Sequence, residues 1–178
     1  YGQLQLGQNE TAKAMVDSML QYCTALPSPR ARAHAILLKS TYLAETNDYS
    51  SPIIDITVDQ RDLNIVSRAK NYFVTGMAAY YQKNKMTMDS LIKQLADERI
   101  IEDLKTTGTG IRMCGNVNRA QTTQTDLLEA ETMEMELRAM RAWLEKDATA
   151  TENFFKKATE LHAKAGYSYG PPSIVKPS

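Results

Sequence analysis

A segment shape that recurs three times along this chain constrains its fold more than any other feature. Each copy consists of a stretch with helical apolar periodicity, a short polar turn and a second such stretch. The three turns are Gly7-Gln8-Asn9, Lys83-Asn84-Lys85 and Lys146-Asp147. Paired helices that repeat along a chain stack into a solenoid, because each pair buries its apolar face against its neighbours. We therefore expect an all-α fold, an α-α superhelix of antiparallel helix pairs.

Apolar residues spaced by three and four positions place the individual helices. They predict one domain over 1–178, with helix pairs at roughly 1–23, 29–46, 60–104 and 117–165 and a C-terminal tail at 166–178. Ser28 and Pro29 suit an N-cap and a first helical position, and Asp59 suits the cap of a helix over 60–83. Residues 47–58 combine turn formers with β-branched side chains, so we expect an extended connector there.

Composition excludes several classes of function. Hydrophobic residues make up 43% of the 178 residues and charged residues 24%, which is typical of a folded chain. Lys plus Arg equals Asp plus Glu, at 21 each, so the chain lacks the overall basic excess typical of nucleic-acid binding, and a local basic patch is the alternative left open. No apolar run approaches the roughly 20 residues of a membrane span. The chain starts without Met and stops without a helix cap, so we expect a fragment of a longer protein, of open localisation.

No set of residues has the spacing of a catalytic or metal site. His34 and His162 have no second ligand nearby in sequence, and no serine lies in a nucleophile-elbow motif. Glu131 and Glu134, within the acidic run 129–136, are spaced to share a cation, but a solvated helix face is the more typical interpretation. We expect no enzymatic activity, no metal and no cofactor; a metal protein built on this run is the weakest alternative.

With their turns aligned, the helix pairs resemble degenerate tetratricopeptide repeats. That motif has small residues where helices touch and a large residue that fills the gap between them. Small and large residues at these positions are Ala12 and Val16 after Gly7, Gly76 and Ile92 around Lys83, and Ala139 and Phe155 around Lys146. The segments Leu4–Gln8 and Gly170–Pro177 also look like stretches of bacterial tetratricopeptide proteins. The turns do not follow the motif's period of about 34 residues, so a generic array of α-α-hairpins is the alternative.

The resemblance implies a concave groove lined by the first helix of each pair. Its groove positions form an aromatic and methionine-rich strip with one charge of each sign, which suits an apolar or amphipathic peptide. They are Lys70, Phe73, Met77, Tyr80, Met133, Glu136, Met140 and Trp143. The basic clamp of chaperone-binding members is not matched at these positions, so we expect no binding to a chaperone's acidic C-terminal tail.

The leading hypothesis is thus a non-enzymatic module that binds a protein or peptide on its concave helical face. The alternative is a structural scaffold or oligomerisation domain within a larger multidomain protein.

Overall fold

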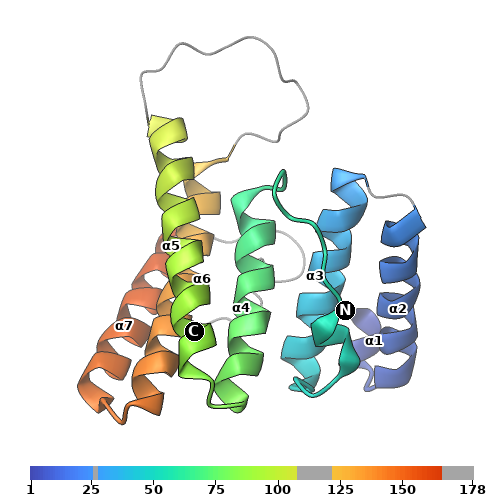
Figure 1. The fold of residues 1–178 in the computed structure, drawn as a ribbon, viewed down its shortest axis with the longest axis horizontal. Coiled ribbons are helices and arrows are strands. Elements are labelled where there is room, and N and C mark those ends of the chain that lie inside the picture. Colours follow the sequence, from blue (N-terminus) through green and yellow to red (C-terminus); the bar gives the residue numbers. More distant parts are fainter. Residues whose placement is uncertain (26–27, 108–121, 166–178) are drawn as a thin grey trace.

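The structure is a computed structural model that describes residues 1–25, 28–107 and 122–165. Every regular element within these residues is a helix, which confirms the expected all-α class. The α-helices are α1 (Gly2–Gln5), α2 (Asn9–Ala25), α3 (Pro29–Thr46), α4 (Ile65–Tyr81), α5 (Lys85–Thr107), α6 (Gln124–Leu144) and α7 (Ala148–Ala165), and a 3-10 helix, η1, spans Pro52–Asp55. Along the longest axis, α2, α3 and α4 follow one another, α5 and α6 overlap in this view, and α7 lies at the far end (Figure 1).

The predicted start of the third pair's first helix is wrong. α4 begins at Ile65, because Asn64 and not Asp59 is its N-cap: the Asn64 side chain accepts the amide of Val66 at 2.8 Å. The Asp59 carboxylate is occupied instead by Arg61, whose backbone amide and Nε both donate to it. Asp59 is therefore bonded within its own loop and does not cap α4.

The predicted extended connector is also wrong in part. Pro52 begins η1, and the hydroxyl of Ser51 accepts the amide of Ile53 at 3.5 Å. The Ile53 side chain is buried against the core. β-branched residues favour a strand only where a neighbouring strand can pair with them, and no strand occurs in the described residues.

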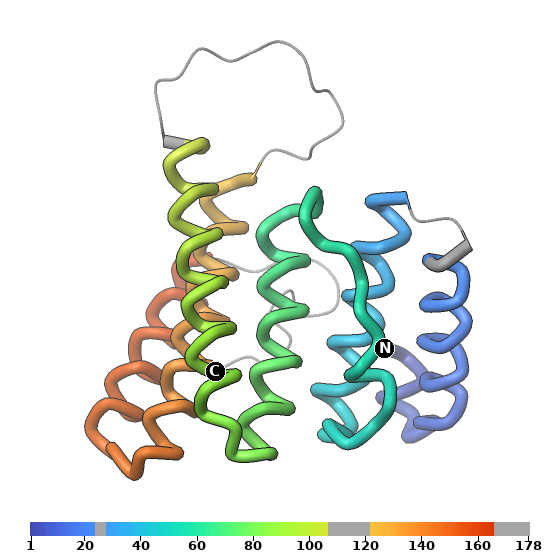
Figure 2. The backbone as a smooth tube through the Cα atoms, viewed as in Figure 1, coloured from blue at the N-terminus to red at the C-terminus, as the bar shows by residue number. Residues whose placement is uncertain are grey.

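The three predicted helix–helix turns share one backbone geometry. Gly7, Lys83 and Lys146 each have a left-handed φ, of 72°, 55° and 63°. In each turn this residue donates its amide to the carbonyl three residues back, and the next residue donates to the carbonyl five back, as in Lys83 to Tyr80 at 2.9 Å and Asn84 to Ala79 at 2.8 Å. This is the Schellman arrangement, which satisfies the carbonyls at a helix end. Figure 2 follows the chain through these reversals.

Neighbouring pairs pack closely because a small residue lies where α4 meets α6. A Cβ atom on Gly76 would come within 2.6 Å of the Leu137 side chain, so a larger residue there would require that side chain to shift. The repeat pattern placed a small residue at 76 where helices touch, and the helix that approaches it is α6, the first helix of the next pair. α4 also contacts α3 and α5, and α6 also contacts α5 and α7.

Buried charges join α5 to α6, and they correct the interpretation of the acidic run as a solvated face. Glu134 is only 2% exposed and accepts hydrogen bonds from Nε of Arg99 on α5, at 2.9 Å, and Nε of Arg138, at 2.8 Å. Glu129 and Glu136 are buried as well. The acidic run alone indicated a solvated face, because Arg99, which pairs with Glu134, lies on another helix and is remote in sequence.

Candidate functional site

A cavity of about 770 Å³ lies where the α4–α5 turn meets the α6–α7 turn. We call it the turn cavity; its lining is Tyr80, Tyr81, Lys83, Trp143, Leu144, Lys146 and Ala148. Tyr81 is 53% exposed and Trp143 is 59% exposed, so both rings present apolar surface to solvent. Large exposed aromatic side chains that line a concave surface are typical of binding sites.

A cluster of three tyrosines fixes one wall of the turn cavity. The rings of Tyr49 and Tyr81 stack with centroids 5.1 Å apart and planes at 23°, and Tyr80 meets Tyr81 edge-on at 5.4 Å. Tyr49 comes from the segment between α3 and η1 and is 5% exposed. Its burial raises the pKa of its hydroxyl, so the ring stays neutral at physiological pH. The buried ring thereby holds the exposed ring of Tyr81 in a defined orientation.

The turn cavity carries positive charge. Lys83 and Lys146 lie in its lining, which contains no acidic residue, and neither forms an ion pair with any described residue. The adjacent Glu145 accepts from Nζ of Lys85 at 2.9 Å and from Arg141 at 2.6 Å, and these bonds hold its pKa below its usual range.

The neighbouring Asp147 is also occupied, because its carboxylate accepts the amide of Ala150 at 2.9 Å and caps α7. Neither of these two carboxylates forms an ion pair with Lys83 or Lys146, so both ammonium groups stay open to a ligand. The site therefore combines aromatic faces for stacking with two ammonium donors.

A second cavity of about 500 Å³, between α5, α6 and α7, is the weaker candidate for binding a charged ligand. Its two arginines are already paired: Arg141 with Asp89 at 2.8 Å, and Arg138 with Glu134 at 2.8 Å. Acidic side chains also line it, so charges of both signs neutralise one another inside the cavity. A charged ligand would have to displace these internal pairs.

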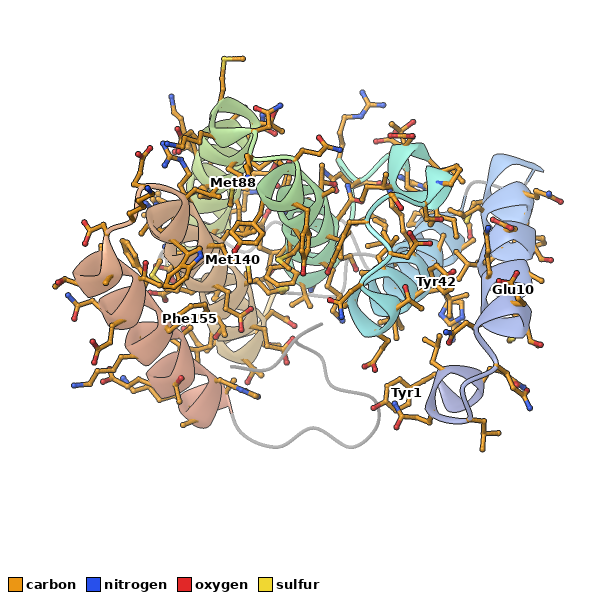
Figure 3. All side chains as sticks on the ribbon, turned by 90° about the horizontal axis from the view of Figure 1, so that it is seen from below. Tyr1, Glu10, Tyr42, Met88, Met140 and Phe155 are labelled. Carbon is orange, nitrogen blue, oxygen red and sulfur yellow. The ribbon has the colours of Figure 1, made fainter. Side chains whose placement is uncertain are left out.

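The structure divides the eight residues predicted for the groove. Tyr80 and Trp143 line the turn cavity. Met140 is half-buried and lies inside the array, packed against the core (Figure 3). The remaining five are buried and offer no open surface; they are Lys70, Phe73, Met77, Met133 and Glu136. Helical spacing places a residue on a face, but it does not reveal that neighbouring helices cover that face.

Sequence reasoning missed most of the turn-cavity lining. Tyr81 and Leu144 follow directly after the two predicted aromatic residues, and Lys83 and Lys146 were used only to mark the turns. The recurrence of an aromatic residue three positions before a lysine, in two successive turns, is the signal that could have found them. Tyr49 had no such signal, because it reaches the cluster from a remote segment.

The described residues contain no group of three or more His, Cys, Asp or Glu side chains that could hold a metal ion. Cys23 is a buried free thiol, whereas Cys114 lies outside the described residues. Within the described part of the chain, none of the helices combines the length and apolarity needed to cross a lipid bilayer. Comparison of the chain with protein-family models, curated proteins and solved structures gave no match.

Proposed function

We propose that this chain is a tetratricopeptide-like interaction module that binds a segment of a protein partner at the turn cavity. The observation that carries the proposal is the pair of exposed aromatic side chains, Tyr81 and Trp143, beside two lysines that have no ion-pair partner among the described residues. Exposed aromatic rings held in a concave site lose little conformational entropy when a ligand covers them, so they contribute strongly to binding.

The arrangement of the helices supports a superhelical array. α4 and α6, the first helices of successive pairs, contact each other, and α6 also contacts α5, the second helix of the preceding pair. The same relation holds at the other end, where α3 contacts both α1 and α2. In this scheme α3 is the first helix of its own pair. The segment between α3 and α4, which contains η1, takes the place of the second helix of that pair.

The size and chemistry of the turn cavity suit a peptide side chain and its neighbours. A volume of about 770 Å³ lies within the range of roughly 300–1,000 Å³ that is usual for ligand sites. Its lining combines hydroxyl, indole and ammonium groups, which can stack on and hydrogen-bond a peptide. Binding of a peptide segment is therefore the function that this site supports best.

The test uses a random peptide library, from which binders are selected on the purified protein. Trp143 is the single tryptophan of the chain, so its fluorescence emission reports directly on occupancy of the turn cavity. We expect selected peptides to change this emission and to bind Tyr81→Ala about tenfold more weakly than wild type.

The matched control is Tyr22→Ala. Tyr22 is 52% exposed, almost as much as Tyr81, but it lies on α2 and outside the turn cavity. Selected peptides should bind this variant as they bind wild type. Failure to select any peptide, or equal binding to the Tyr81→Ala variant and to wild type, would contradict the proposed function.

A further inference from the structure

The turn cavity is assembled from the same three positions of two successive turns. In both turns the left-handed residue is a lysine, and an aromatic residue lies three positions before it. The pairs of equivalent lining residues are Tyr80 and Trp143, Tyr81 and Leu144, and Lys83 and Lys146. The cavity therefore presents aromatic surface and one ammonium group from each turn.

The two lysines occupy a backbone conformation that glycine adopts more easily. Lys83 has a φ of 55° and Lys146 a φ of 63°, and the first turn has Gly7 at the equivalent place with a φ of 72°. L-residues with a side chain are disfavoured in this region. Both lysine side chains are exposed, so packing does not require them. What they add to the turns is positive charge at the rim of the cavity.

This charge is local. The chain as a whole has a formal net charge of zero, and Lys85, which follows Lys83 closely, is neutralised by Glu145 at 2.9 Å. A nucleic acid would need a longer basic track than two lysines provide. A short peptide segment with a few carboxylates can instead pair with the two ammonium groups of Lys83 and Lys146.

We infer that the occupant of the turn cavity is an acidic segment of a protein partner that carries an aromatic side chain between its carboxylates. This inference rests on the proposed function. The aromatic side chain stacks against Tyr81 and Trp143, and the flanking carboxylates accept hydrogen bonds from Nζ of Lys83 and Lys146.

The experiment titrates three synthetic peptides, each blocked at both ends so that no terminal charge contributes. The first has a phenylalanine flanked by aspartate and glutamate, the second has alanine in place of the phenylalanine, and the third has lysine in place of each acidic residue. Emission of Trp143 gives the affinity, and a thymidine oligonucleotide serves as a second kind of polyanion. We expect the first peptide to bind more tightly than the other two and than the oligonucleotide.

The decisive variant is Lys83→Gly combined with Lys146→Gly. It should bind the acidic aromatic peptide about tenfold more weakly, at roughly threefold per exposed charged contact. Its melting temperature should equal or exceed that of wild type, because glycine relieves the left-handed conformation. Lys156→Ala with Lys157→Ala, two exposed lysines on α7, is the control and should bind as wild type does.

Equal binding of the acidic and lysine-containing peptides would overturn the inference. Undiminished binding of the acidic aromatic peptide to the Lys83→Gly, Lys146→Gly variant would do the same, as would tighter binding of the oligonucleotide. If library-selected peptides bind at Trp143 but are not enriched in acidic and aromatic residues, the inference fails while the proposed function stands. If no selected peptide binds there, both fail.

Discussion

A Cβ atom on Gly76 of α4 would lie 2.6 Å from Cδ2 of Leu137 on α6, which is itself fully buried. The Leu137 side chain thus packs directly onto the backbone of α4 at Gly76. Gly76→Ala should lower the free energy of unfolding by about 1 kcal/mol, because overpacking, at about 1–3 kcal/mol, outweighs the roughly 1 kcal/mol by which alanine favours a helix over glycine. Urea denaturation followed by circular dichroism measures the difference.

The control for this prediction is the same substitution in a Leu137→Ala background. There the clash is gone and only the helix preference remains, so Gly76→Ala should stabilise the protein by about 1 kcal/mol. A change of equal sign and size in both backgrounds would show that the cost of Gly76→Ala does not come from its contact with Leu137.

The buried carboxylate of Glu134 should be the most sensitive charge between α5 and α6. Glu134→Ala leaves Arg99 and Arg138 without the oxygen atoms that they now contact at 2.9 Å and 2.8 Å. Loss of one partner of a buried pair costs about 3–5 kcal/mol; because Arg138 retains 35% exposure of its side chain, we expect the lower part of this range.

Glu131 provides the matched comparison, because it belongs to the same acidic run but lies 3.9 Å from Arg99. Glu131→Ala should change the free energy of unfolding by less than about 1 kcal/mol. Similar losses for the two variants, measured by chemical denaturation, would contradict the assignment of Glu134 as the central residue of this network.

Because of buried Lys39, we expect the free energy of unfolding to rise at alkaline pH. Its Nζ donates to the carbonyl oxygens of Ile54 and Ile56 at 2.9 Å and 2.7 Å, and burial lowers its pKa from 10.5 to about 8, although the Asp55 carboxylate opposes the shift. Between these two pKa values the unfolded chain holds a proton that the folded chain has lost. Stability therefore rises as pH increases from about 8 to about 10.

The size of this rise can be isolated with Lys39→Met. From pH 7 to pH 9.5 wild type should gain about 2 kcal/mol relative to the variant, because one pKa unit corresponds to about 1.4 kcal/mol. Parallel pH dependence of the two proteins in urea denaturation would show that Lys39 titrates normally and that its burial does not penalise its charge.

The helices could be predicted from the sequence because their periodicity and their turns are local properties. Gly7, Lys83 and Lys146 mark turns that the structure forms with the same hydrogen bonds. The burial of Glu134 could not be predicted, because its neighbour Arg99 belongs to another helix. Tyr49 likewise reaches Tyr81 from a segment that the sequence pattern assigned to a connector. Side-chain environment depends on such remote contacts, and a helical face alone does not specify them.

The residues predicted for the groove should fall into two energetic classes. Phe73 is fully buried in the core cluster, so Phe73→Ala should lower the free energy of unfolding by about 3–5 kcal/mol. Trp143 is 59% exposed, so Trp143→Ala should lower it by less than about 1 kcal/mol while removing much of the binding surface of the turn cavity. A loss at Trp143 as large as that at Phe73, in parallel thermal and urea denaturation, would identify the tryptophan as a core residue and remove the basis for a binding site at the two turns.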